Sequence, residues 1–262
     1  MNNSINTSPV IILGAPRSGT NMLRDLICQH PKFDTWDCDE INPIWKFKNY
    51  NKSDELKVND LKIDIERYIK NKFYKISKGK KLSVVEKTCA NTLRPSFVNT
   101  IFPNAKYIFI YRNGYDCVIS AKKKKQKRFD IKYQIKKIKH SPLISYPFLL
   151  KEKLLTNSWG PRYIGIDDDL KNISEIEVVA KQWMKCNSLS YEFLKTINHS
   201  QYLNISYEKF VSNPKNGLKE ILNFFDIPPS SFESFKINHI FTSSIGKSKF
   251  SISTDEKQLI SK

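Results

Sequence analysis

Short runs of apolar, mostly β-branched or aromatic residues punctuate this chain, and longer stretches with a different period separate them. The runs lie at Val10–Leu13, Leu82–Val85, Ala105–Tyr111 and Tyr202–Ile205. A short continuous apolar run is typical of a strand that is buried on both faces of a parallel sheet. We therefore predict four parallel strands at these positions.

Between the strands, apolar residues recur every three or four positions, which is the spacing of an amphipathic helix. Such stretches cover residues 20–30, 56–75, 115–124 and 174–196, and a further one carries Leu218, Ile221, Leu222 and Phe225. Ser174 followed by Glu177 has the spacing of a capping box, which marks a helix start. Strands that alternate with helices predict an α/β fold, with a P-loop-like parallel sheet flanked by helices on both faces.

The length of 262 residues suits one sizeable domain, so we expect a single catalytic domain over residues 1–262. Residues 122–139 are rich in lysine and poor in apolar residues, and Pro142, Pro147, Gly160 and Pro161 follow them. We predict a basic insertion or lid at about 122–162. The alternative is a solvated basic loop without a role, because runs of like charge usually lie at the surface.

The formal net charge of +18 suits an anionic ligand or partner. The chain is crowded with Lys, Asn and Ile, so general codon bias explains the charge equally well. Five cysteines without CxxC spacing argue against a disulfide framework and against a structural zinc site. No apolar stretch is long enough to span a membrane and no signal peptide is visible, so we expect a cytoplasmic protein.

The most informative motif follows the first predicted strand, where Gly14–Asn21 reads GAPRSGTN and leads into a helix. Glycines allow close backbone approach, and the N–H groups of such a loop and of the helix start can converge on a phosphate-like anion. A nucleoside triphosphate loop would read GxxxxGK[ST]. Here Thr20 replaces the lysine and Asn21 the magnesium-binding hydroxyl, so the loop is poorly suited to ATP hydrolysis. Arg17 supplies basic charge instead.

A second segment, YRNGYDCVIS, follows the third predicted strand at Tyr111–Ser120. Arginine offers phosphate a rigid fork of donors, and a serine two helical turns on can add a hydroxyl bond. The string PRSGT is similar to the 5′-phosphosulfate loop of the sulfotransferase family, and the second segment resembles that family's 3′-phosphate segment. The resemblance implies the donor 3′-phosphoadenosine 5′-phosphosulfate. It also implies these donor-binding residues: Pro16, Arg17, Ser18, Gly19, Thr20, Asn21, Arg112 and Ser120.

Further resemblances to the family cover most of the chain. They comprise EKT at 86–88, FPNAK at 102–106, WGPR at 159–162, QW at 182–183, and YEKF at 207–210 followed by Asn213 and Pro214. IGKSK at 245–249 resembles the family's glycine- and lysine-bearing 3′-phosphate loop, although Ser248 stands where a tryptophan is usual. Lys247 and Lys249 are therefore donor-site candidates, or solvated lysines.

Sulfuryl transfer needs a base for the acceptor and positive charge near the departing oxygen, without an obligatory metal. The natural charge donors are Lys87 and Arg17. The family's small-molecule branch has a catalytic histidine where this chain has Cys89, so that mechanism does not carry over. The four histidines (His30, His140, His199, His239) lie outside the motifs, and we interpret them as structural or surface residues.

Another branch, acting on carbohydrates or protein tyrosines, uses a glutamate shortly after the first helix, and Glu40 fits that description. Asp39 is the alternative base. The other interpretation is that this acidic segment is a solvated loop without a catalytic role. Three acids in four residues, Asp37, Asp39 and Glu40, should repel one another, which could raise the pKa of one of them.

The sequence thus predicts a sulfotransferase with a hydroxyl acceptor. We expect a carbohydrate or glycolipid, and a tyrosine or a small metabolite is the alternative acceptor. A P-loop kinase or other NTPase is the main rival function. The second rival is a nucleic-acid-binding protein that uses the basic run Lys122–Arg128, but no recognised reading module accompanies that run, so we expect no nucleic acid partner.

Overall fold

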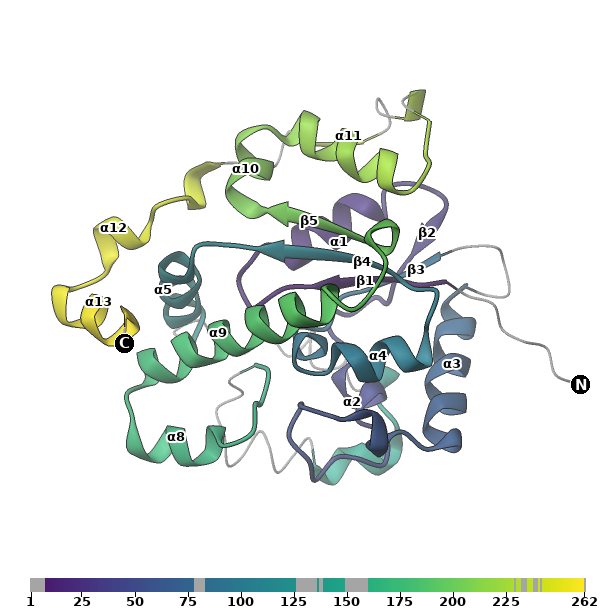
Figure 1. Cartoon of the computed structure of the whole chain (residues 1–262), viewed down its shortest axis with the longest axis horizontal. Helices are drawn as coiled ribbons and strands as arrows, with labels where there is room; N and C mark the ends of the chain where they lie inside the picture. The colour runs from purple at the N-terminus through teal and green to yellow at the C-terminus, as the bar shows by residue number, and fades with distance from the viewer. Residues whose placement is uncertain are drawn as a thin grey trace, which may run out of the picture.

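We describe the chain from a computed structural model, which covers residues 8–77, 83–125, 136, 139–148, 160–228, 230–231, 235–237, 240 and 242–261. Its strands form one parallel sheet in the order β2-β3-β1-β4-β5 (Figure 1). The strands are β1 Val10–Leu13, β2 Phe33–Asp34, β3 Ser83–Glu86, β4 Lys106–Tyr111 and β5 Tyr202–Ser206. The four predicted strands are confirmed, apart from Leu82, which lies outside the described residues.

The α-helices within the described residues alternate with these strands. They are α1 Thr20–Ile27, α2 Asn42–Trp45, α3 Ile63–Ser77, α4 Pro95–Ile101, α5 Gly114–Lys125, α8 Ile166–Asn172, α9 Glu175–Leu194, α10 Tyr207–Ser212, α11 Pro214–Phe224, α12 Ser248–Ser251 and α13 Thr254–Ser261. The capping box is confirmed, because the Ser174 hydroxyl accepts a hydrogen bond from the Glu177 N–H at 3.4 Å.

Several elements differ from the prediction. Helices α2, α4, α8, α10, α12 and α13 were not predicted. Strand β2 has only Phe33 and Asp34, too few residues to leave a periodic signal, and it pairs with β3 at the edge of the sheet. Helix α3 begins at Ile63 rather than near residue 56, because Val58–Asp60 forms a short 3-10 helix first. There the Asp60 carboxylate accepts a hydrogen bond from the Lys57 N–H at 2.8 Å, which stabilises a local turn instead of an α-helix.

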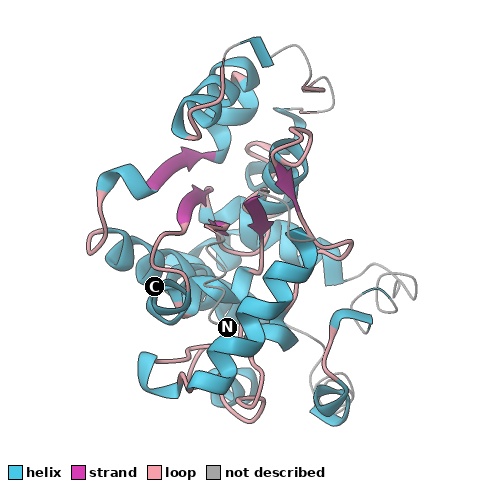
Figure 2. Ribbon diagram, turned by 90° about the vertical axis from the view of Figure 1, so that its right-hand side faces the viewer, coloured by secondary structure: helices cyan, strands magenta, loops and turns pink. Residues whose placement is uncertain are grey.

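The central strand β1 divides the core into two layers. Ile11 and Leu13 pack into one cluster with side chains from α3, α4 and α9, whereas Val10 and Ile12 pack into another with side chains from α1, α10 and α11. Helices accordingly cover both faces of the strands (Figure 2). The predicted fold class is confirmed, and burial on both faces explains why the inner strands β1, β3 and β4 read as continuous apolar runs.

Strand β1 lies between β3 and β4 and is parallel to both. The chain segments that follow these three strands therefore leave the sheet at its same edge, the carboxyl end of the strands. Ligands of open parallel α/β sheets bind outside the carboxyl ends of the strands. The segments that follow β1, β3 and β4 are those that carry the predicted site residues.

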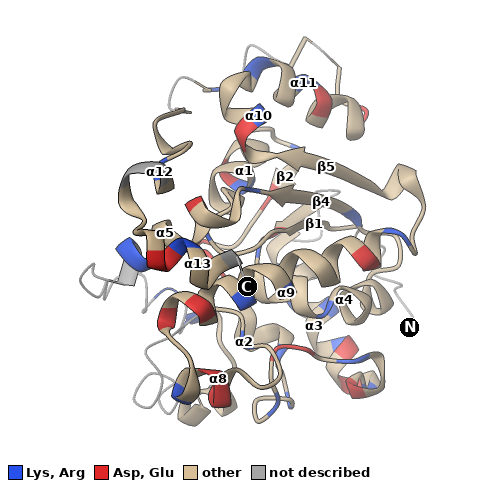
Figure 3. Ribbon diagram, turned by 60° about the vertical axis from the view of Figure 1, so that its left-hand side comes forward, with Lys and Arg blue, Asp and Glu red and all other residues tan. Residues whose placement is uncertain are grey.

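Charge is distributed unevenly over the described residues (Figure 3). Lys122 and Lys123 are exposed near the end of α5, whereas Asp167, Asp168 and Asp169 make the first turn of α8 acidic. Much of the predicted basic insertion lies outside the described residues, including Gln126–Gln134, Trp159 and the end of the Lys122–Arg128 run. Within the described chain, no helix is both long and apolar enough to cross a membrane.

Candidate active site

The loop between β1 and α1 adopts a conformation that few residues allow. Arg17 and Gly19 have positive φ angles of 72° and 90°, and the Ser18 N–H donates to the Ala15 carbonyl at 3.1 Å. A Cβ atom at Gly19 would lie 2.5 Å from the Tyr207 ring, so a larger residue would not fit there. Glycine is therefore required at this position both for its backbone angle and for the close approach of Tyr207.

This loop leaves the start of α1 open for an anion. Gly19 provides no side-chain cap, and the first turn of the helix contains no acidic residue. The first N–H groups of a helix have no intrahelical partner and carry partial positive charge. These open N–H groups fit the 5′-phosphosulfate end of the predicted donor. The Asn21 Oδ1 atom is buried without a hydrogen-bond partner among the described residues, and as an acceptor it needs a donor rather than an anion.

Arg112 joins the second predicted segment to this loop. Its Nη1 atom donates to the Arg17 carbonyl at 2.9 Å, and its guanidinium lies 4.3 Å from the centre of the Tyr207 ring. The Arg17 Nε atom donates to the Ser120 hydroxyl at 3.0 Å. The structure thus brings Arg17, Arg112 and Ser120 together, although 103 residues separate the first from the last.

Arg112 also has capacity left for a phosphate. Its side chain is buried, and within the described part of the molecule its Nε atom has no hydrogen-bond partner. A buried arginine donor without a partner is costly unless a ligand satisfies it. The arrangement fits the 3′-phosphate of the predicted donor.

The other donor-site candidates differ in their burial and surroundings. Ser18 is buried with its hydroxyl 3.6 Å from the Cys117 sulfur, and Pro16 lies beside Gly160. Lys247 is exposed on the turn before α12. Lys249 lies in α12, but its side chain is outside what the structure describes.

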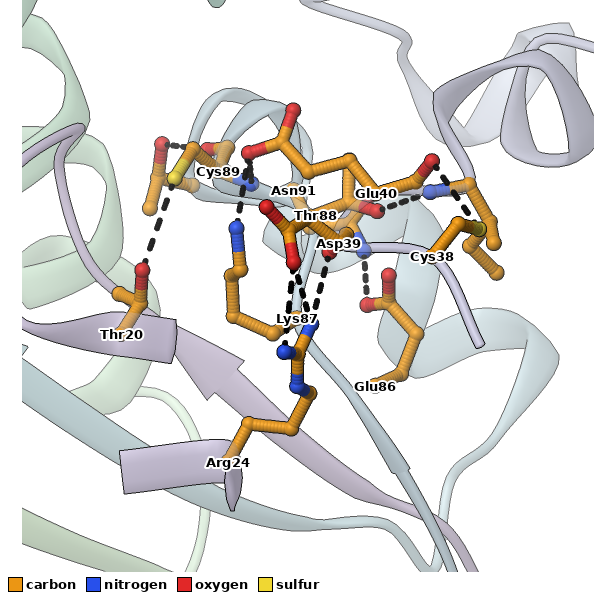
Figure 4. A network of polar contacts seen from close by, with 12 residues as sticks. Thr20, Arg24, Cys38, Asp39, Glu40, Glu86, Lys87, Thr88, Cys89 and Asn91 are labelled. Carbon is orange, nitrogen blue, oxygen red and sulfur yellow. Dashed lines mark hydrogen bonds and ion pairs between the residues drawn. The ribbon is translucent and has the colours of Figure 1, made fainter. Parts of the chain in front are cut away.

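The second part of the site is centred on Glu40. Its Oε1 atom accepts a hydrogen bond from Lys87 Nζ at 3.1 Å and from the Cys89 N–H at 3.4 Å (Figure 4). Lys87 is 5% exposed. Burial opposes its charge, but the surrounding acidic groups, Glu40 foremost and Asp39 with it, together hold the pKa of Lys87 above its ordinary value. Lys87 is therefore a fixed positive charge beside a fixed carboxylate.

The neighbouring acids have partners of their own, which corrects the expected mutual repulsion. The buried Arg24 guanidinium contacts Asp39 at 3.3 Å, and His140 contacts Asp37. Burial of Asp37 acts to raise its pKa, but the hydrogen bond and charge of His140 bring it below the usual range. The expectation of a raised pKa is therefore wrong for Asp37, because His140 and Lys139 lie beside its carboxylate.

A buried polar network fixes the strand end that carries Lys87. Glu86 is fully buried and accepts a hydrogen bond from the Asn91 amide at 2.6 Å, and burial raises the pKa of its carboxyl. Arg94 Nε in turn donates to Asn91 Oδ1 at 2.8 Å. On the other side, the Thr88 hydroxyl accepts from the Ile41 N–H at 3.1 Å. Thr88 therefore ties the segment of Lys87 to the segment of Glu40.

Cys89 occupies the position at which the small-molecule branch of the family has its catalytic histidine. Burial raises the pKa of its thiol to about 12, so it is not a thiolate near neutral pH. Its sulfur lies 3.9 Å from the Thr20 hydroxyl of the loop after β1. Cys89 thus connects the two parts of the site without being a nucleophile or a base. All five cysteines are described, and all are free thiols.

The histidines take the positions expected of structural or surface residues, as far as they are described. His30 is buried and stacks on Phe235, and His199 contacts the Tyr202 hydroxyl at 2.8 Å. His140 is the exception, since it pairs with Asp37 within the segment that carries Glu40. His239 lies outside the described residues.

Two charged residues of the site were missed by the sequence analysis. Arg24 lies on the buried face of α1, and Asp116, in the first turn of α5, lies four residues after Arg112 and four before Ser120. Both residues could have been found in the sequence. A charged residue at a core-facing helical position, such as Arg24, predicts a buried partner. An acid four residues after the candidate phosphate-binding arginine, such as Asp116, predicts a contact near it.

Comparison with known proteins decides the family. A model described as the sulfotransferase family matches residues 9–143, which carry the loop after β1, Glu40, Lys87 and the segment Arg112–Ser120. The chain belongs to the sulfotransferase family. It is therefore an enzyme that uses 3′-phosphoadenosine 5′-phosphosulfate as donor, and this activity takes precedence over the kinase and nucleic-acid-binding rivals. A comparison with curated proteins finds no significant match.

Solved structures agree with this fold. The chain is similar to the sulfotransferase domain of the curacin biosynthetic pathway, at 17% identity and a TM-score of 0.56, covering 97% of this chain and 96% of that one. It is also similar to the sulfotransferase domain of the Synechococcus PCC 7002 olefin synthase, at 14% identity and a TM-score of 0.57, covering 97% and 94%. A sulfotransferase from Mycobacterium avium matches at 11% identity and a TM-score of 0.52, covering 87% and 66%. At these identities the likeness shows the shared α/β fold.

Proposed function

We propose that the chain, as one sulfotransferase domain over residues 1–262, transfers a sulfuryl group to a hydroxyl of a carbohydrate or glycolipid. Glu40 is the base in this proposal. The observation that carries it is the contact of 3.1 Å between Glu40 Oε1 and Lys87 Nζ, next to the loop that binds the donor. A carboxylate and an ammonium are thereby held together where one proton must leave and one negative charge must develop.

The residues present fit both ends of the donor. The loop Pro16–Asn21 would hold the 5′-phosphosulfate with its N–H groups, and Arg112 with Ser120 would hold the 3′-phosphate. When bound, the donor supplies an activated sulfuryl group and a nucleotide leaving group. Lys247 and Lys249 are candidates to add charge at the 3′-phosphate.

Glu40 accepts the proton from the acceptor hydroxyl as its oxygen bonds to sulfur. Lys87 stabilises the negative charge that develops on the departing phosphate oxygen when the bond from sulfur to that oxygen breaks. Arg17, exposed on the loop, adds positive charge on the donor side. The proton ends on Glu40, and the sulfated acceptor and adenosine 3′,5′-bisphosphate leave the site.

Asp39 is the weaker candidate for the base. Arg24 engages its Oδ1 atom with two nitrogens, each at 3.3 Å, and Nη1 also donates to the Asp39 carbonyl at 3.4 Å. Two nitrogens of a buried arginine on one oxygen hold a carboxylate in place and stabilise its charge. Glu40 is the better candidate because its carboxylate lies 3.1 Å from Lys87 Nζ, the group proposed to stabilise the departing oxygen.

The acceptor class rests on the resemblance to the glutamate branch of the family and on the WGPR string, of which Gly160–Arg162 lie within the described residues. The test is transfer of labelled sulfate from the donor into separated glycan, lipid and protein fractions of whole cells. We expect label in the glycan or lipid fraction with the wild type, and none with Glu40→Gln. Label confined to the protein fraction would contradict the carbohydrate assignment, while label in no fraction would contradict the activity.

A further inference from the structure

Asp116 connects the donor site to the C-terminal part of the chain. It is 3% exposed, and its two carboxylate oxygens accept backbone hydrogen bonds from Gly246 at 2.7 Å and from Ser248 at 2.9 Å. These N–H groups lie 130 and 132 residues along the chain from Asp116. A single buried side chain thus determines where this distant turn sits.

The same turn is fastened to the 3′-phosphate residue itself. Arg112 Nη2 donates to the Ser244 carbonyl at 2.6 Å, and the Tyr207 and Ser244 hydroxyls are in contact. Gly246 has a φ angle of 68°, which permits the sharp turn between the two anchor points. Lys247 lies between the two N–H groups that Asp116 holds, and its own side chain is exposed.

We propose that Asp116 is a positioning residue for the donor, which holds the turn 244–248 against Arg112 and so completes the site that distinguishes nucleotides with a 3′-phosphate. The inference rests on the proposed donor site. Asp116 does not contact the donor in this account. It acts through the backbone of Gly246 and Ser248, which presents Lys247 toward the region beside Arg112.

The charge of Asp116 raises an obvious objection, because a carboxylate 3.9 Å from Arg112 would repel a phosphate. The two backbone N–H groups answer it, since each carboxylate oxygen is already occupied by one of them. Burial acts to raise the pKa of Asp116, but these N–H groups and Arg112 bring it below the usual range. The carboxylate stays ionised, and the two backbone N–H groups of the turn compensate its charge.

Asp116→Asn tests this arrangement with a nearly isosteric change. An asparagine offers one acceptor oxygen, and its amide nitrogen would face the second backbone N–H, so one anchor of the turn is lost. The probes are adenosine 3′,5′-bisphosphate and adenosine 5′-monophosphate, whose affinities are measured by calorimetric titration of the full chain. Asp255→Asn is the matched control, because Asp255 is exposed in the first turn of α13.

We expect Asp116→Asn to bind the bisphosphate about 10-fold more weakly, as befits loss of one charge-assisted hydrogen bond. Binding of the monophosphate should fall less than about 3-fold, and turnover at saturating donor should change by a similarly small factor. Asp255→Asn should match the wild type with both nucleotides. A merely structural role for Asp116 would weaken both nucleotides equally, and that result would overturn the inference.

Lys247→Ala keeps the test decisive if Asp116→Asn fails to fold, because an exposed side chain can be removed without disturbing the core. It should also reduce the preference for the bisphosphate, and an unchanged preference in it would overturn the inference. A wild type that binds both nucleotides equally would instead overturn the donor site itself, and this inference with it. The two failures are therefore distinguishable.

Discussion

The two parts of the active site are built from different kinds of contact. The donor part uses backbone: the loop after β1, the first turn of α1 and the Arg17 carbonyl that Arg112 holds. The part around Glu40 uses side chains: Lys87 with Glu40, and Arg24 with Asp39. A backbone cradle tolerates many side chains but demands special backbone angles, whereas an ion pair depends on the presence of both partners.

This difference teaches where single substitutions will act. Loss of one donor-site side chain leaves several N–H groups to bind the anion, so affinity falls while the chemistry survives. Loss of Glu40 or Lys87 removes a group that no neighbour replaces. Substitutions around Glu40 should therefore change kcat, and those around Arg112 should change the affinity for the donor.

The largest effect is expected from Glu40→Gln. Removing a general base lowers kcat by about 100- to 10,000-fold, while nucleotide binding should change less than about 3-fold. Initial rates and calorimetric titration of adenosine 3′,5′-bisphosphate measure the two quantities. Near-normal turnover would refute Glu40 as the base.

Lys87→Met should come next. It removes the buried ammonium and keeps most of the side-chain volume, and loss of one such electrostatic donor costs about 100- to 1,000-fold in kcat. Thermal unfolding of the variant shows whether the Glu86 and Thr88 network still holds the strand end. A folded variant with an unchanged kcat would show that Lys87 does not stabilise the departing oxygen.

Arg112→Lys sharpens the comparison from the donor side. Lysine keeps the charge but cannot bridge the Arg17 and Ser244 carbonyls and still present a third nitrogen. The donor KM should rise by about 10- to 100-fold, since hydrogen bonds to charged groups are the strong ones, and kcat should remain within about 5-fold. A loss confined to kcat would mean that the two parts of the site are not separable.

Asp39→Asn should have a smaller effect. The amide loses the ion pair, but Arg24 keeps its contact of 2.6 Å with Asp25 and its bond to the Asp39 carbonyl. We expect kcat to fall by about 3- to 10-fold, because the segment that carries Glu40 is less firmly held. Steady-state rates beside those of Glu40→Gln measure it. A loss as large as that of Glu40→Gln would make Asp39 the base.

Cys89→Ser should have the smallest effect on turnover, within about 3-fold, since a thiol of pKa about 12 takes no part as a nucleophile. Stability should respond to pH. The thiol ionises near pH 9.0 when unfolded but only near pH 12 when folded, so the unfolded state loses its proton first and stability falls as pH rises. The serine variant should lose about 1.4 kcal/mol less per pH unit above pH 9. Denaturant titrations at pH 8 and pH 10.5 measure this difference.

The sequence by itself determined the fold class, and it predicted the donor part of the site. Most residues of β1, β3 and β4 are buried, so these strands were visible as apolar runs. Edge strand β5 buries only Ile205 and was visible from its short run Tyr202–Ile205. The loop after β1 and the segment after β4 are local motifs, and neighbouring parallel strands deliver their following segments to the same edge of the sheet. Strand β2 was not predicted, because two residues are too few to show the hydrophobic period of a strand.

Tertiary structure decided how the charges pair. Three acids in four residues look alike in the sequence, but each contacts a different side chain in the structure. The pairs are Arg24 with Asp39, His140 with Asp37, and Lys87 with Glu40. Asp116 likewise looks like an ordinary helical acid until the turn at Gly246 and Ser248 folds onto it. The physical reason is range: hydrophobic period and backbone propensity act over a few residues, whereas an ion pair depends on which distant side chain the fold brings within about 4 Å.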